Sequence, residues 1–204
     1  KEEEQSYKSA TWSEIFGLKG VKPALLGFFC YCAAEMTTGL WGSSFLVKYN
    51  GVSPDISARW ISLFYVGITV GRFICGFITM KFSNRTMIRM GQIICGIGAI
   101  TLMLPLPEGF SVVGLTLIGL GCAPIYPCML HETPKRFGET MSQSLMRIQM
   151  AFAYIGTTLM PPILGVLASK FSIGLYPYFI FILILVMLIS SEKINRIVKN
   201  REVQ

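Results

Sequence analysis

The sequence predicts an all-α membrane protein of six transmembrane helices, and three observations lead to that prediction. Of the 204 residues, 52% are hydrophobic and only 14% are charged, whereas about a quarter of the residues in a soluble domain are charged. The apolar residues gather in six runs, each close to the roughly 20 residues that a helix needs to cross a bilayer. Short polar segments separate these runs, so the chain has no room for a separate soluble domain.

The predicted elements follow one another with short connections. Residues 1–22 are polar and weakly amphipathic, which predicts a cytoplasmic connector near the membrane interface. Residues 23–191 are predicted to form a six-helix transmembrane bundle, and the basic residues 192–204 a cytoplasmic tail. Within the bundle we predict spans at 23–47, 58–80, 87–105, 110–130, 142–168 and 173–190.

Basic residues set the predicted orientation, because Lys and Arg in short loops are retained on the cytoplasmic side during insertion. With the amino end inside, thirteen of the eighteen basic residues fall in cytoplasmic segments. Only Lys48, Arg59 and Lys170 fall in outer loops, and Arg72 and Arg147 fall within spans. We therefore predict a multi-pass protein of the cell membrane with both termini in the cytoplasm.

Several function classes are not supported. The net charge of +7 is spread over short segments rather than along one face, so we expect no nucleic acid partner. The six cysteines lie in apolar runs without a CxxC pair, so we expect no metal site and no cofactor. His131-Glu132 lacks the second His of a zinc helix, and there is no nucleophile elbow, so we expect no enzyme.

The chain contains an internal repeat. Shifting it by 89 residues aligns 65–83 with 154–172 without a gap, with identical residues at eight of nineteen positions. The shift covers three spans, an odd number, so the second copy must cross the membrane in the opposite direction. The six spans are therefore predicted to form two inverted three-helix repeats, although two apolar helices can also resemble each other by chance.

Three stretches of the sequence resemble a known family. They are Tyr31-Cys-Ala-Ala-Glu35 with Gly39 and Trp41, Gly119-Leu-Gly-Cys-Ala-Pro-Ile-Tyr-Pro127 with the following His-Glu-Thr-Pro, and Ile148-Gln-Met-Ala-Phe-Ala-Tyr-Ile-Gly156 running into Met160-Pro-Pro162. Over nearly its full length the chain resembles the carboxy-terminal half, helices seven to twelve, of a major facilitator superfamily transporter, and within it the fucose permease-like branch of bacteria.

The resemblance implies half of a major facilitator fold in a bacterial inner membrane. It also implies an amino-terminal six-helix half as partner, and the first residue, Lys1, agrees with a piece of a longer chain. The expected function is secondary active transport of a small solute by alternating access, with a sugar or related polar metabolite as substrate and a proton as a candidate coupling ion. The alternative is a non-transporting scaffold or a half-transporter that pairs with itself.

Glu35 is the acidic residue that lies well inside an apolar run, about 15 Å along its helix and near the bilayer centre. An ionisable residue at that depth favours a functional role, so Glu35 is the candidate for proton coupling. Arg72 falls at a similar depth on the next span and is its candidate ion-pair partner. The alternative is a purely structural pair inside the bundle.

Other polar and aromatic residues at membrane depth are candidates for binding substrate, because aromatic faces pack on sugar rings while amides and hydroxyls bond their hydroxyl groups. Each is also a candidate for ordinary helix packing. Two spans carry prolines that free backbone carbonyls and favour helix flexing during transport. The substrate candidates are Thr38, Trp41, Tyr65, Tyr126, Gln149 and Tyr154, and the flexing candidates are Pro124, Pro127, Pro161 and Pro162.

Overall fold

The computed structural model describes residues 12–202, and in this part of the chain every regular element is a helix. A short α1 (Trp12–Gly17) precedes α2 (Val21–Lys48), α3 (Pro54–Ile78), α4 (Asn84–Met103), α5 (Gly109–Phe137), α6 (Glu139–Lys170), the 3-10 turn η1 (Ile173–Leu175) and α7 (Tyr176–Glu202). The all-α prediction is confirmed. Most of the predicted connector, residues 1–11, lies outside the described residues.

Six of the helices match the predicted spans in order. By length and composition five of them, α3 to α7, are apolar enough to cross a membrane. The other, α2, has 28 residues but includes Glu35 and a run of threonine, glycine and serine. It contacts α3, α5, α6 and α7, and protein neighbours rather than lipid therefore surround much of its polar surface. The predicted tail continues as helix, because α7 extends to Glu202.

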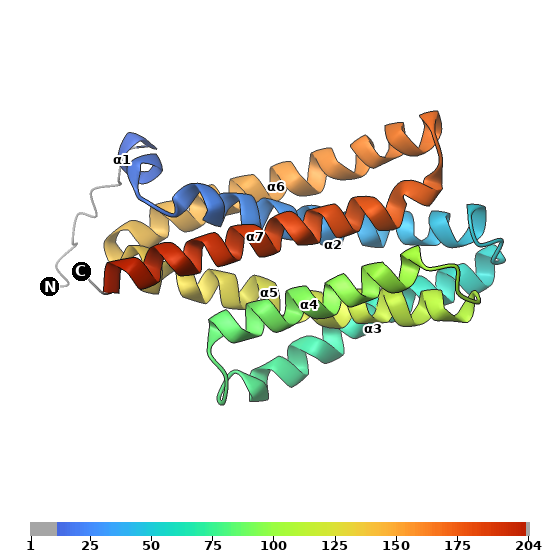
Figure 1. The fold of residues 1–204 in the computed structure, drawn as a ribbon, viewed down its shortest axis with the longest axis horizontal. Helices are drawn as coiled ribbons and strands as arrows, with labels where there is room; N and C mark the ends of the chain where they lie inside the picture. Colours follow the sequence, from blue (N-terminus) through green and yellow to red (C-terminus); the bar gives the residue numbers. More distant parts are fainter. Residues whose placement is uncertain (1–11, 203–204) are drawn as a thin grey trace, which may run out of the picture.

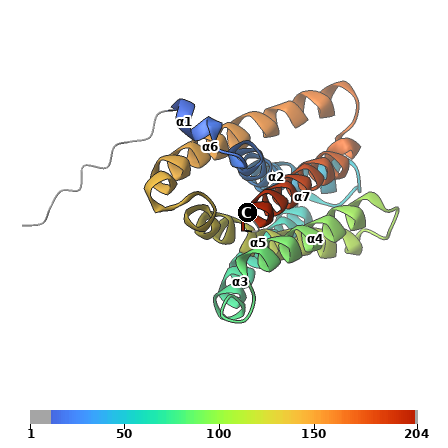
Figure 2. The ribbon, with the colours of Figure 1, turned by 60° about the vertical axis from the view of Figure 1, so that its left-hand side comes forward.

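The helices form two three-helix units, α2 to α4 and α5 to α7. The most extensive contacts join α4 to α5, α3 to α5, α2 to α6 and α2 to α7. In the repeat, α2 corresponds to α5, α3 to α6 and α4 to α7. The contact of α3 with α5 therefore corresponds to that of α6 with α2, and the contact of α4 with α5 to that of α7 with α2, so the contact pattern repeats. Figures 1 and 2 both show α3 and α6 at opposite edges of the bundle. In each, only 22% of the most apolar stretch is buried, so the two helices occupy equivalent places.

Two glycines at corresponding positions of the repeat each approach the backbone of a helix in the other unit closely. A Cβ on Gly67 of α3 would lie 2.8 Å from the carbonyl oxygen of Thr116 and 3.1 Å from the amide nitrogen of Leu120. A Cβ on Gly156 of α6 would lie 2.6 Å from the carbonyl oxygen of Phe29 and 3.4 Å from the amide nitrogen of Ala33. Small residues let helix backbones approach closely. The predicted inverted repeat is thus visible at the level of single backbone contacts.

A polar cluster, Asn84, Arg85, Glu132, Arg136 and Asn195, joins the first turn of α4, the end of α5 and the last third of α7. The side chain of Glu132 is 6% exposed. Its carboxylate accepts from Arg136 Nε at 3.1 Å, Arg85 Nε at 3.5 Å and Asn84 Nδ2 at 3.3 Å. Arg136 Nη2 donates to Asn195 Oδ1 at 3.0 Å. We call this set the Glu132 cluster.

Candidate functional site

Glu35 and Arg72 face each other from neighbouring helices. Glu35 lies in the middle of α2 and Arg72 in the second half of α3, and the nearest oxygen and nitrogen of the two side chains are 3.8 Å apart. The distance is too long for a hydrogen bond. The side chains are 28% and 54% exposed, respectively. The pair is therefore an open ion pair on a surface that the described residues do not cover.

A cavity of about 260 Å³ holds this ion pair. Residues of four helices line it, namely Tyr31, Cys32, Glu35 and Met36 of α2, Tyr65 and Arg72 of α3, Tyr126 of α5 and Thr157 of α6. Tyr126 packs against two aromatic neighbours, with ring centroids 5.3 Å from Phe28 and 6.0 Å from Tyr31. The cavity thus combines one carboxylate, one guanidinium and an aromatic wall.

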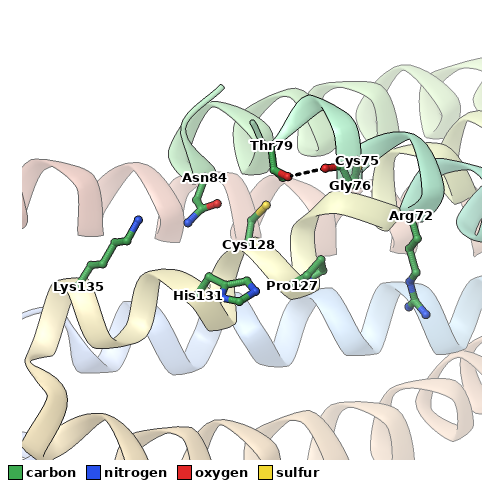
Figure 3. A pocket seen from close by; sticks show the side chains of 9 residues that line it. All are labelled: Arg72, Cys75, Gly76, Thr79, Asn84, Pro127, Cys128, His131 and Lys135. Atoms are coloured by element: carbon green, nitrogen blue, oxygen red, sulfur yellow. Dashed lines mark hydrogen bonds between the residues drawn. The ribbon is translucent and has the colours of Figure 1, made fainter. Parts of the chain in front are cut away.

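A second cavity, of about 550 Å³, lies on the other side of Arg72. In Figure 3, Lys135 and His131 of α5 follow one another along it, and Arg72 turns from α3 toward α2, which carries Glu35. Thr79 and Asn84 add polar groups to its wall. Arg72 lines both cavities, so its guanidinium lies between the Glu35 cavity and the more basic cavity that extends toward Lys135.

The structure brings together only part of the predicted substrate set. Tyr65 and Tyr126 line the cavity with Glu35 and Arg72. Thr38 is fully buried and donates to the Ala34 carbonyl oxygen at 2.7 Å.

Two further candidates hold helices together. The indole nitrogen of Trp41 donates to the Pro161 carbonyl oxygen at 3.0 Å, which joins α2 to α6. Gln149 is 3% exposed, and its side-chain oxygen accepts from Thr133 Oγ1 at 3.1 Å, which joins α6 to α5. Neither lines the cavity of Glu35, so their contacts are those of helix packing.

Tyr154 and the four prolines do not line the cavity of the ion pair, although Pro127 lines the second cavity together with Arg72. Tyr154 is 72% exposed on α6 and is not among the cavity residues. The helices α5 and α6 run without a break through Pro124, Pro127, Pro161 and Pro162. The prolines therefore do not end either helix in this conformation, and their role in flexing stays a prediction.

Sequence reasoning missed two residues. Tyr31 lies one turn before Glu35 and is 1% exposed, but a tyrosine in an apolar run gives no signal of its own. Glu132 is an acid more deeply buried than Glu35, and its four-residue spacing from Arg136 on a helix was the available signal. Within residues 12–202 no group of three or more His, Cys, Asp or Glu side chains is placed to hold a metal ion.

Comparisons with known proteins agree on one fold and one family. A family model described as "Major Facilitator Superfamily" matches residues 24–193. The chain is 25% identical over 171 residues to a Helicobacter pylori (strain J99) protein named "Putative glucose/galactose transporter", covering 82% of this chain and 40% of that protein. It is 24% identical over 191 residues to "Bypass of stop codon protein 6" of Saccharomyces cerevisiae, covering 87% and 38%. The chain thus spans about two fifths of the length of these relatives.

Solved structures give the same fold. The outward conformation of the major facilitator superfamily transporter FucP matches with a TM-score of 0.77 and 17% identity, over 88% of this chain and 43% of that one. The peptide transporter PepTSo, of the POT family, matches with a TM-score of 0.76 and 14% identity, over 85% and 37%. In both, the match covers less than half of the longer chain.

Proposed function

The chain belongs to the major facilitator superfamily, and we propose that, within a complete transporter, it moves a small polar solute across a membrane by alternating access. The observation that carries this proposal is the Glu35–Arg72 ion pair in a cavity shared by α2, α3, α5 and α6. Ionisable residues are expensive inside a membrane and mark substrate or ion pathways. The two side chains are partly exposed and 3.8 Å apart without a hydrogen bond, so the pair can separate and re-form with small side-chain movements.

Glu35 is the proposed proton-coupling residue. Its carboxylate is partly exposed and 3.8 Å from Arg72, so a modest movement of either side chain separates them. Separation leaves the carboxylate without a counter-charge, and it then takes up a proton because an isolated charge is unstable away from water. When the cavity reopens to the opposite side, Arg72 returns and the proton leaves. Arg72 is the proposed switch because it lines both cavities.

The proposed solute is a sugar or a related polar metabolite. The mixture of tyrosine rings, a carboxylate and a guanidinium suits a ligand with hydroxyl groups and an apolar ring face. The name of the Helicobacter pylori relative, "Putative glucose/galactose transporter", supports the same class.

The proposed partners are a lipid bilayer and a second six-helix unit. The relatives are more than twice as long as the matched part. The edge helices α3 and α6 expose large apolar side chains, including Val66, Phe73 and Ile155. Lipid or another helical unit must cover them. We propose that both termini lie in the cytoplasm of a bacterial cell, because thirteen of the eighteen basic residues fall in the segments that this orientation puts inside.

Replacing Glu35 with Gln in the complete transporter tests the coupling. In proteoliposomes with a proton gradient, accumulation of labelled glucose or galactose should fall to equilibrium, while exchange of inside for outside sugar should continue. Exchange needs the solute to cross but needs no net movement of protons. The matched control is Glu108→Gln, an exposed acid between α4 and α5. Unchanged accumulation in the Glu35→Gln protein would remove the coupling role.

The oligomeric state of the chain on its own tests the partner. A chain that needs an amino-terminal half should be monomeric in mild detergent and inactive in liposomes until that half is supplied. A stable dimer that transports sugar by itself would instead identify a self-pairing half-transporter, and a stable dimer without transport would favour a scaffold.

A further inference from the structure

An apolar groove of about 320 Å³ lies where α1, α2 and α6 come together, away from the Glu35 cavity. The short helix α1 lies beside the beginning of α2 (Figure 1), because Ile15 is buried against Val21 and Leu25. The groove is open at the surface of the described residues, since two of its side chains are each 44% exposed. Its apolar wall consists of Phe16 of α1, Leu25, Leu26 and Phe29 of α2, and Phe152 and Ile155 of α6.

One charged side chain, Lys22, lines the groove at the end nearest the beginning of α2. Lys22 is exposed, and no acidic residue of the described chain lines the groove with it. The repeat shift of 89 residues puts Ser111 at the corresponding position of the other unit. Ser111 is 8% exposed and accepts a hydrogen bond from Asn50 at 2.7 Å. Helix packing therefore does not require a lysine at this position, and its charge needs another explanation.

The groove extends from headgroup depth into the hydrocarbon. With Glu35 at the predicted bilayer centre, Lys22 lies thirteen residues before it, which is about 20 Å along α2. Half of the hydrocarbon core is about 15 Å thick, so Lys22 reaches the level of the lipid headgroups. Phe29 lies six residues before Glu35, about 9 Å from the centre. A molecule that matches the groove thus carries a charged group at one end and an apolar chain at the other.

We propose that this groove binds an anionic phospholipid of the cytoplasmic leaflet, with one acyl chain between α2 and α6 and the phosphate beside Lys22. The ammonium group offers three donors and a positive charge to the phosphate oxygens. A zwitterionic headgroup offers the same phosphate but adds a cation of its own, which Lys22 repels. An apolar protein segment would match the wall but not the charge at headgroup depth. The choice of leaflet rests on the proposed orientation, and nothing here depends on the solute.

Photo-crosslinking of lipids to the purified complete transporter tests the site. The carrier vesicles are phosphatidylcholine with equal small amounts of phosphatidylglycerol and phosphatidylcholine whose diazirine acyl chains differ in mass. Mass spectrometry then gives the ratio of the two labels on peptides that contain Phe29 or Ile155. We expect the wild type to favour phosphatidylglycerol, and Lys22→Gln to lower this preference by about fivefold, the effect of one basic residue near an anionic lipid. Each ratio is measured within one sample, so it does not depend on the yield of folded protein.

The chain supplies matched controls for the charge and for the wall. Lys48→Gln removes an exposed lysine from the other end of α2 and should leave the ratio unchanged. Ile155→Phe fills the groove and should reduce labelling of the Phe29 peptide by both lipids. Val66→Phe makes the same change at the corresponding position of the repeat, on α3, where the side chain is 49% exposed. It should leave labelling of the groove unchanged.

Four outcomes would overturn the proposal. They are equal labelling by the two lipids in the wild type, an unchanged ratio in Lys22→Gln, an equal loss of preference in Lys48→Gln, and absence of label from the groove peptides. The third would assign the preference to general attraction by the membrane surface, and the fourth would show that a protein segment covers the groove. None of them contradicts solute transport, and failure of the Glu35→Gln experiment would leave the lipid site standing.

Discussion

Two acid–arginine sites of the bundle use the same chemical groups in opposite ways. In the Glu132 cluster the carboxylate is 6% exposed and accepts hydrogen bonds from three side chains. At mid-helix, Glu35 is 28% exposed and has one ion-pair contact to Arg72, at 3.8 Å. The difference lies in the exposure of the carboxylate and in the number of charged and amide donors that bind it. A fully bonded carboxylate holds helices together, whereas an incompletely bonded one remains available to a proton or a solute.

The strongest test of this contrast is Glu132→Gln. The change leaves Arg136 buried without its counter-charge, and breaking a buried pair in this way costs about 3–5 kcal/mol. We expect a matching loss in the free energy of unfolding, measured by denaturant titration in detergent. Glu35→Gln should lower the same quantity by less than about 1 kcal/mol, because its pair is partly exposed and 3.8 Å apart. Equal losses at both sites would refute the contrast.

Arg136→Lys tests whether geometry matters as well as charge. Lysine keeps the charge but cannot hold Glu132 and Asn195 together from one planar group, as Arg136 does. Losing a hydrogen bond of a charged group costs about 1.5–3 kcal/mol, and we expect a fall in unfolding free energy of this size. Arg72→Lys is the comparison, and it should leave stability nearly unchanged because Arg72 contacts Glu35 without a hydrogen bond.

Arg89→Gln gives the smallest expected effect. Arg89 donates to both carboxylate oxygens of Glu192, at 2.7 and 2.8 Å, but its side chain is 55% exposed. Exposed pairs contribute about 0.2–1 kcal/mol even with good geometry, and salt screens them. The loss of stability should therefore shrink in 1 M salt, whereas that of Glu132→Gln should persist. A large, salt-independent loss would show that geometry outweighs hydration.

Much of the fold was predictable because the bilayer restricts what a chain can do. Runs of apolar residues must become helices there, since backbone groups find no water to bond. The boundaries were less predictable. The sixth span was predicted at 173–190, but α7 extends to Glu202 because Ile194 and Val198 pack against Ala24. A basic segment beyond the membrane can remain helical when one of its faces finds a partner.

The site was predictable only where depth along a helix carried the information. Depth alone put Glu35 and Arg72 at one level, and the structure has them 3.8 Å apart. Depth does not say toward which neighbouring helix or cavity a side chain points. Trp41 and Gln149 therefore had the right depth but bond to neighbouring helices. Tyr31 has both depth and direction, but its sequence context resembles ordinary packing.

The inverted repeat raises the question of what distinguishes one side of the membrane from the other. Two units related by a half turn form a backbone with nearly equivalent ends. The repeat shift of 89 residues puts Ser43 at the position that corresponds to Glu132. Ser43 shares a neutral hydrogen bond of 2.8 Å with Ser57. Charged side chains thus join the helices at one end of the bundle, and hydroxyl groups join them at the other. The difference between the two ends therefore lies in the side chains. Exchanging these two sets would exchange the two ends and leave the course of the backbone as it is.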